Sequence, residues 1–340
     1  SVAAAASISF GPLIGGYLVD DYSWHLIFDV NVPVGLAAIL FAIFIQKEWR
    51  GARAGSFDWP GFLCVVCFMP LLIFALARGN SPLNPEGWSS PEVIGCFAVA
   101  AAALIVFIVR ELRCENPLLN LKLLGERNFG VSMAVLAIFG IGMLGGTYLL
   151  PLYMQKGLGY TAIMAGSVFL PVGLIQGVLS TCSGFLTRYI KPLFIAVTGI
   201  LVMTLSFYFA SRFTLHTTHA QIMLVLYLRG FGMGLTFAPL NDFSLMNLSQ
   251  RDMASAAGIS NSIKQLSGSV SIALLTVILT GRTAFHSAQG GLSSAESYVA
   301  GISDDFLFVT FVSLASALPF LWLLRPRRKA ASFKSEGTGT

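Results

Sequence analysis

Gly11-Pro12-Leu13-Ile14-Gly15-Gly16 lies inside an apolar stretch that is already under way at Ser1. In a soluble helix, a proline beside several glycines removes a backbone donor and adds flexible positions. A bilayer relieves this penalty, because neighbouring helices satisfy the freed carbonyl groups and small residues let another backbone approach. Gly11 and Gly15 are four residues apart, so we expect them to form a flat stripe on a kinked, tightly packed membrane helix.

The composition also indicates a membrane protein. Hydrophobic residues make up 55% of the chain and charged residues only 11%, whereas soluble domains are about one-quarter charged. A membrane-spanning helix needs about 20 mostly apolar residues, and we predict an all-α polytopic membrane protein with about ten such helices. The expected spans are Val2–Val19, Leu26–Ile45, Trp59–Ala77, Val93–Val109, Phe129–Leu150, Ala165–Phe185, Leu193–Ala210, Ile222–Leu240, Ile259–Leu279 and Phe306–Leu324.

The basic residues give this map an orientation. Most of the 21 lysines and arginines fall in alternate loops, and basic residues near span ends stay preferentially in the cytoplasm. We therefore expect the first helix to run outward and the carboxyl terminus to be cytoplasmic. The net charge of +5 then reflects membrane topology, which leaves little support for nucleic-acid binding.

The opening hexapeptide is followed by Trp24-His25-Leu26-Ile27-Phe28 and by Asn31-Val32-Pro33-Val34-Gly35. Together these segments resemble the antiporter motif of the fifth helix in major facilitator drug:proton antiporters, and look most like the fourteen-span EmrB/QacA-type branch. The resemblance implies a major facilitator fold with ten of an expected fourteen helices present, so we expect the sequence to be amino-terminally incomplete. It assigns the motif to Gly11, Pro12, Gly15 and Gly16.

The same resemblance implies a division of the chain. Residues 1–58 would end the amino-terminal six-helix half, 59–110 would hold two linker helices, and 111–128 would form a cytoplasmic connector. Residues 129–326 would be the carboxyl-terminal six-helix half, and 327–340 a cytoplasmic tail.

The function implied by the resemblance is proton-coupled efflux of lipophilic or cationic drugs across the inner membrane by alternating access. An EmrB-like protein would work with a periplasmic adaptor and an outer-membrane channel. The sequence has no Gly-x-x-x-x-Gly-Lys-Ser/Thr loop for nucleotide binding. We therefore expect a transporter that is not an enzyme, has no cofactor and draws its energy from a proton gradient.

Ionisable residues within spans are the first candidates for a functional site, because burying a charge in a membrane is costly. Arg229 lies near mid-span and is followed by a glycine-rich face, while Lys264 lies nearer the cytoplasmic end and has a side chain long enough to reach the headgroups. Asp29 lies a few residues into the second span, where burial would favour a proton carrier; a shallow position in contact with water is the alternative. Asp242 is a similar candidate at the inner gate.

Multidrug substrates favour a cavity wall that is apolar and adaptable. Aromatic, thioether and amide side chains provide such a surface, although each of them also suits packing between helices. The residues that we expect to line the cavity are Asn31, Met143, Tyr148, Tyr153, Gln176, Phe231, Met233 and Phe237. The glycine-interrupted segments Gly140–Gly146 and Arg229–Gly234 are further pointers to a moving or binding element.

Other functions remain open at this point. An exporter of one defined solute, such as an amino acid, a sugar or a siderophore, is the alternative within transport. Cys64 and Cys67 have the spacing of a redox pair, which would suit a membrane thiol oxidoreductase, but no charged neighbour activates them. His216 and His219 lack accompanying ligands, so we expect no metal site. A non-transporting membrane subunit is a third alternative.

Overall fold

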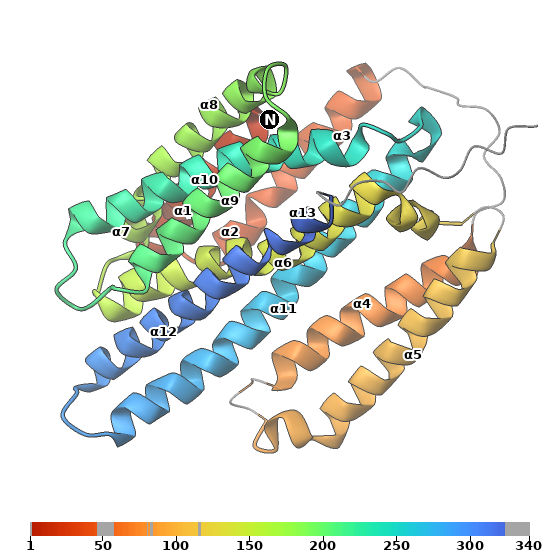
Figure 1. The fold of residues 1–340 in the computed structure, drawn as a ribbon. Coiled ribbons are helices and arrows are strands. Elements are labelled where there is room, and N and C mark those ends of the chain that lie inside the picture. Colours follow the sequence, from red (N-terminus) through yellow and green to blue (C-terminus); the bar gives the residue numbers. More distant parts are fainter. Residues whose placement is uncertain (1, 46–57, 80, 82–83, 115–116, 324–340) are drawn as a thin grey trace, which may run out of the picture.

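The computed structural model describes residues 2–45, 58–79, 81, 84–114 and 117–323, and their side chains from Phe10 onward except Arg251, Leu321 and Leu323. All of its regular elements are helices (Figure 1), as expected for an all-α membrane protein. In chain order they are α1 (Val2–Asp21), α2 (Leu26–Asp29), α3 (Asn31–Ile45), α4 (Trp59–Gly79), η1 (Gly87–Ser89), α5 (Pro91–Arg113), η2 (Leu121–Gly125), α6 (Arg127–Leu152), η3 (Tyr153–Gly157), α7 (Ala162–Ser167), α8 (Leu170–Leu186), α9 (Pro192–Ala210), α10 (His219–Leu245), η4 (Gln250–Asp252), α11 (Met253–Ala288), α12 (Ser294–Ala315) and α13 (Leu318–Leu323).

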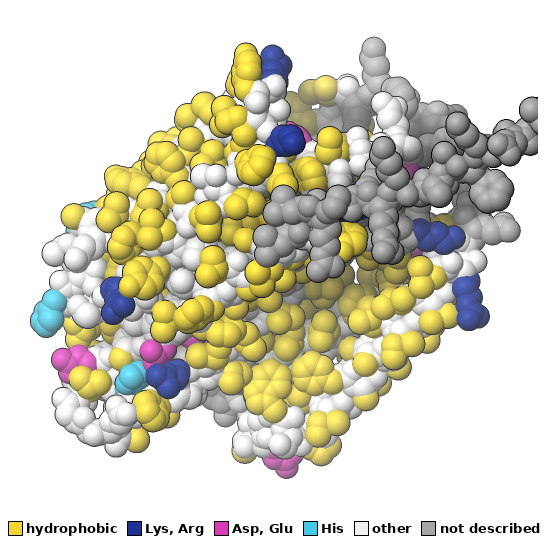
Figure 2. Space-filling model, in the orientation of Figure 1, with side chains coloured by type: hydrophobic (Ala, Val, Ile, Leu, Met, Phe, Trp, Pro, Cys, Tyr) yellow, Lys and Arg dark blue, Asp and Glu magenta, His cyan; other side chains and the backbone are white. Residues whose placement is uncertain are grey.

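Nine helical segments in the described part of the chain are long and apolar enough to cross a membrane. They match nine of the ten expected spans, and α1 covers the tenth. Apolar side chains are spread over the surface of the helices, while charged side chains gather towards the ends of the bundle (Figure 2). This distribution is what a bilayer requires of a multi-pass protein.

Two helices near the carboxyl terminus are longer than the hydropathy suggested. The helix α11 has 36 residues and extends beyond both ends of the expected span at Ile259–Leu279. The helix α12 begins at Ser294 rather than near Phe306, because Ser293 and Glu296 form a capping box that starts the helix. The polar residues between Ser294 and Phe306 are therefore helical and pack against α11.

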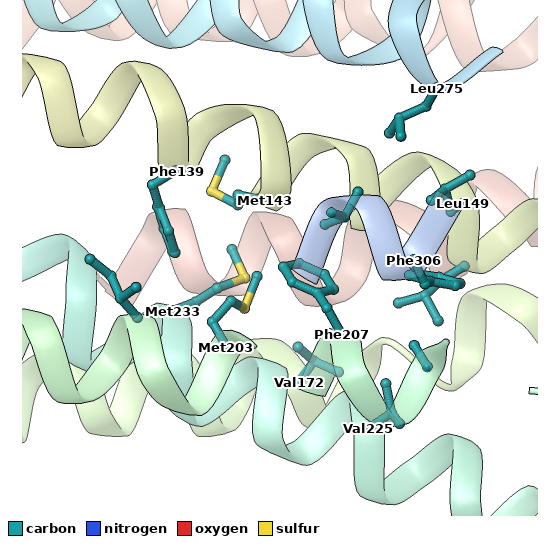
Figure 3. Close-up of a cluster of buried hydrophobic side chains, with 14 of the residues drawn as sticks. Phe139, Met143, Leu149, Val172, Met203, Phe207, Val225, Met233, Leu275 and Phe306 are labelled. Carbon is teal, nitrogen blue, oxygen red and sulfur yellow. The ribbon is translucent and has the colours of Figure 1, made fainter. Parts of the chain in front are cut away.

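The core of the bundle is built around α6, which contacts α10, α11, α12 and α13. Phe207 of α9 stacks near Phe306 of α12, with ring centroids 6.5 Å apart, and both side chains are buried. Figure 3 shows these rings among methionine and aliphatic side chains from several helices. Where α9 meets α10, Gly199 and Gly232 let the two backbones approach, since a side chain on either would collide with the facing helix.

The helices α4 and α5 lie side by side as a separate hairpin next to α11 (Figure 1). At one end of the pair, Asp58 accepts a hydrogen bond from the backbone N–H of Gly61 and pairs with Arg110, whose Nε lies 2.7 Å from its carboxylate. Burial raises the pKa of Asp58, but these two partners outweigh it and lower the pKa below the usual value. Glu111 accepts a hydrogen bond from the backbone N–H of Leu119, which ties the hairpin to the segment before α6.

Candidate functional site

Arg229 of α10 is a buried cation in the interior of the helical bundle. Its side chain is only 2% exposed. One terminal nitrogen donates to the carbonyl oxygen of Met143 at 3.0 Å and to the hydroxyl of Thr147, both on α6. The other terminal nitrogen has no hydrogen-bond partner among the described residues. The guanidinium group therefore joins α10 to α6 and keeps unused donor capacity in the interior.

The glycine segment Gly140–Gly146 makes this contact possible. It lies in the middle of α6, which continues through it without a break, and the segment Arg229–Gly234 likewise lies within a continuous α10. A side chain at Gly146 would meet the ring of Phe207 and approach Arg229, and one at Gly145 would meet Leu275. The glycines thus act as close-packing positions rather than as breaks in the helices.

A cavity of ≈ 130 Å³ lies between α6, α10 and α11. It brings together two of the expected residues, Phe237 and Lys264, which lie on different helices. Its wall combines apolar side chains with amide and hydroxyl groups, and its residues are Met133, Leu136, Phe237, Leu240, Asn241, Ser244, Ser260, Asn261 and Lys264. An apolar chamber with one cation and a few amides is suited to a mainly lipophilic ligand that carries a polar group.

The other expected cavity residues are distributed differently. Met143, Tyr153, Gln176 and Met233 are buried among helices, and the Tyr153 hydroxyl donates to the carbonyl oxygen of Thr214 at 2.8 Å. The hydroxyl of Tyr148 lies 3.1 Å from that of Thr276 on α11.

Four expected residues are on the surface of the described structure. Phe231 is 44% exposed. Asn31 is also exposed and donates to the carbonyl oxygen of Ile27, one turn earlier. Asp29, at the end of α2, is exposed, as is Asp242 on α10. Both carboxylates are thus on the surface of the described structure, and their proton-carrying role stays a prediction.

The antiporter segment of α1 packs against α7 and α8. A side chain at Gly16 would lie 2.5 Å from the carbonyl oxygen of Ala162, and one at Gly166 would collide with the backbone of Pro12. At Gly11 and Gly15, by contrast, a side chain would have no described atom within 4 Å. The expected close approach therefore occurs, but at Gly16 rather than at Gly11 and Gly15.

An acidic side chain extends this contact. The Asp20 carboxylate accepts hydrogen bonds from the backbone N–H groups of Ala162 and Ile163, at 3.3 and 2.7 Å. A cavity of ≈ 280 Å³ lies beside the contact, between Pro12 of α1 and Pro151 of α6.

The cysteines and histidines form no second site in the described part of the chain. All five cysteines are free thiols, and Cys67 is exposed while Cys64 is half-buried. No group of three potential metal-binding side chains occurs among the residues that the structure describes.

Comparison with known proteins identifies the family. The model of the Major Facilitator Superfamily matches residues 1–272. This chain belongs to the Major Facilitator Superfamily. It is 31% identical over 280 residues to the protein named "Uncharacterized MFS-type transporter YhcA" of Bacillus subtilis. The matched region covers 82% of this chain and 52% of that protein.

Two further relatives are named for drug export or resistance. "Multidrug export protein EmrB" of Escherichia coli is 30% identical over 282 residues, which is 82% of this chain and 54% of that protein. "Puromycin resistance protein pur8" of Streptomyces alboniger is 28% identical over 334 residues, or 95% of this chain and 64% of that protein. The chain thus spans about half the length of the first two of these superfamily members.

One polar cluster in this major facilitator chain was missed by the sequence analysis. Asp304 of α12 accepts from Arg282 at 2.6 Å and lies 2.8 Å from the ring nitrogen of His286, both on α11. Asp305, the next residue, is completely buried. Hydropathy placed these residues in a loop, whereas the capping box at Ser293 was the signal that would have placed them on a helix.

Proposed function

We propose that this chain serves in the proton-coupled export of lipophilic or cationic drugs across the cytoplasmic membrane. The observation that carries the proposal is the 30% identity to "Multidrug export protein EmrB" over 82% of this chain. The apolar cavity between α6, α10 and α11, with Lys264 and two amides in its wall, supports it. The relative named for puromycin resistance points to the same class of substrate.

Transport would proceed by alternating access, in which the two halves of the transporter rock about a site near the midplane. Residues 129–326 would form the carboxyl-terminal half, with 59–110 as linker helices and 111–128 as a cytoplasmic connector. Arg229 would hold α6 and α10 in register beside the moving surface, through its bonds to Met143 and Thr147. Lys264 and Phe237 would contact the drug.

The orientation follows from the basic residues, which favour the cytoplasmic side. The ends of the helices that carry Arg110 and Arg113 would face the cytoplasm, together with the carboxyl terminus. The turn between α11 and α12 would face the outside. An adaptor and an outer-membrane channel would complete export in a cell with two membranes, as the resemblance to the EmrB type implies.

The test measures drug accumulation in efflux-deficient cells. The transporter containing this chain is expressed with its native upstream sequence, and ethidium is the probe because it is cationic and fluorescent. We expect lower accumulation than in cells with an empty vector, and restoration by a protonophore. Unchanged accumulation with the protein correctly inserted in the membrane would overturn the multidrug assignment.

A matched pair of variants tests the cavity. Lys264→Gln alters the cavity wall, whereas Lys156→Gln removes an exposed cation on η3, outside the cavity. We expect the first change to alter the relative export of ethidium and of a neutral drug, and the second to leave it unchanged. Equal drug profiles for both variants would show that the cavity does not bind the drug.

A further inference from the structure

The carboxyl group of Asp305 has no role in the transport site described above, and its environment is unusual. It lies on α12, is 0% exposed, and neither of its oxygens has a hydrogen-bond partner among the described residues. Its neighbour Asp304 differs sharply, because Asp304 is partly exposed and pairs with both Arg282 and His286. Two adjacent carboxyl groups are thus held in opposite environments.

The surroundings of Asp305 are tightly packed. One turn before it, a side chain at Gly301 would meet Thr283 and Leu279 of α11; one turn after it, Val309 would meet a side chain at Gly145 of α6. Asp305 therefore lies on the side of α12 that meets α6 and α11. An ionised carboxylate without a partner in such a place is very costly, so this conformation is that of the protonated group.

Further unpartnered oxygens lie along the same contact. Ser297 is on the same face of α12, two turns before Asp305, and its buried hydroxyl has no partner in the described structure. The same holds for the hydroxyl of Thr283, which faces Gly301 from α11. Ser297 and Thr283 are both closer to the α11–α12 turn than Asp305 is. Two unpartnered hydroxyl groups thus lie on this contact, between that end of the bundle and the buried carboxyl.

The charged groups around this contact are accounted for on each packed helix. On α11 the Arg282 guanidinium is bonded to Asp304, and His286 shares that carboxylate. Lys156 on η3 is exposed. The described residues of α9 include no charged side chain, and those of α6 include only Arg127, its first residue. Arg229 of α10 reaches α6 beside Gly146, and one of its nitrogens has no partner in the described structure. The remaining titratable groups nearby are the phenols Tyr148, Tyr153 and Tyr298, of which Tyr298 lies within electrostatic range of both Asp305 and Tyr148.

We propose that Asp305 is a proton-binding residue of the transport cycle, loaded from the extracytoplasmic side along the contact between α11 and α12. This inference rests on the function and orientation proposed above. Loading joins one proton to the Asp305 carboxylate to give the neutral carboxyl, and release returns that proton to solvent. No electrons are exchanged.

The packing explains how such a site would couple to movement. Once the proton leaves, the carboxylate needs a partner or water, and the guanidinium of the adjacent cluster, Arg282, is already bonded to Asp304. The contact between α11 and α12 must then open, or Arg282 must change partner. Conversely, the closed contact seen here forms only when the carboxyl is neutral. The position of α12 therefore reports whether the proton is bound.

The experiment uses the purified full-length transporter in liposomes. Asp305→Asn mimics the protonated group in shape and removes its ability to ionise. Glu296→Gln is the matched control, because it neutralises an exposed acid on the same helix and still supports the capping box. Two assays are compared: drug accumulation driven by an imposed pH gradient, and exchange of labelled for unlabelled drug without a gradient.

We expect Asp305→Asn to reduce gradient-driven accumulation at least tenfold while exchange stays within twofold of the unmodified protein. Glu296→Gln should behave like the unmodified protein in both assays. Gradient-driven accumulation by Asp305→Asn at the unmodified level would overturn the proposal. Failure of the unmodified protein in both assays would instead contradict the proposed function.

A spectroscopic readout keeps the proposal testable without transport and without a variant that folds poorly. Infrared difference spectra of the unmodified protein, recorded between neutral and alkaline pH, should contain a protonated carboxyl C=O band that shifts on hydrogen–deuterium exchange. Asp305→Glu should move this band and Glu296→Gln should keep it. A spectrum of the unmodified protein with no such band at neutral pH would refute the assignment by itself.

Discussion

Adding one methyl group at Gly16 is predicted to separate α1 from α7 and α8. The new Cβ atom would lie 2.5 Å from the carbonyl oxygen of Ala162, whereas ordinary contact begins at 3.4 Å. The obstacle is backbone on both sides and cannot rotate away, so the helices must move apart by ~1 Å, and overpacking of this kind costs about 1–3 kcal/mol. A change of that size alters a conformational equilibrium by a factor of about 5–150.

Gly15→Ala is the matched control for Gly16→Ala. Both substitutions lie in α1 and gain the same helix propensity, about 1 kcal/mol relative to glycine, but a side chain at Gly15 meets nothing within 4 Å in the described structure. The difference between the two variants therefore isolates the contact with Ala162.

The assay is the thermal unfolding midpoint of the purified transporter, together with the initial rate of ethidium efflux. We expect Gly16→Ala to unfold at a lower temperature than Gly15→Ala and to transport more slowly. Equal midpoints and equal rates for the two variants would show that α1 does not dock through Gly16.

Three further variants have expected outcomes. Arg229→Gln loses charged hydrogen bonds to α6, each worth about 1.5–3 kcal/mol, so its unfolding midpoint should fall; an unchanged midpoint would contradict the bonding seen here. Asp58 has a lowered pKa in the fold, because the Gly61 N–H and Arg110 outweigh the effect of burial. Its stabilising contribution is present at neutral pH and lost as the pH falls below about 4. Unfolding midpoints should therefore decline at acidic pH, and less steeply in Asp58→Asn than in the unmodified protein. Identical pH dependence of the two midpoints would contradict a stabilising role for the contacts of Asp58 with Gly61 and Arg110. Replacing Cys64 and Cys67 together by serine should leave efflux intact, and loss of efflux would revive the thiol hypothesis.

The spans could be predicted from the sequence because a bilayer imposes a length and a polarity on every helix. The same reasoning failed at the amino-terminal end of α12, where Ser297, Asp304 and Asp305 reduce the hydropathy although the backbone is helical. Their polar groups face another helix rather than lipid. Hydropathy measures affinity for a membrane, and it carries no information about a polar contact that is buried between two helices.

Partners of individual side chains were harder to predict than helices. Gly11, Gly15 and Gly16 are chemically identical, and only the rotation of α1 about its axis decides which of them faces Ala162. Arg229 could be identified as a candidate because burying a charged side chain in a membrane is costly. Its partners Met143 and Thr147, however, lie more than eighty positions away in the chain. Such pairings depend on tertiary packing, which no local pattern encodes.

Polar contacts hold the described bundle at both of its ends as well as at its middle, and this has a mechanical consequence. At the end proposed to be cytoplasmic, Asn120 before η2 donates to Asp252, which precedes α11. At the opposite end, Asp304 joins α12 to α11. Between these ends α6 packs closely through glycines, and its directional bonds there include those of Arg229 to Met143 and Thr147. A helix held in this way can tilt about its middle. The polar contacts at its two ends can then break and re-form one end at a time. That is the movement that alternating access requires.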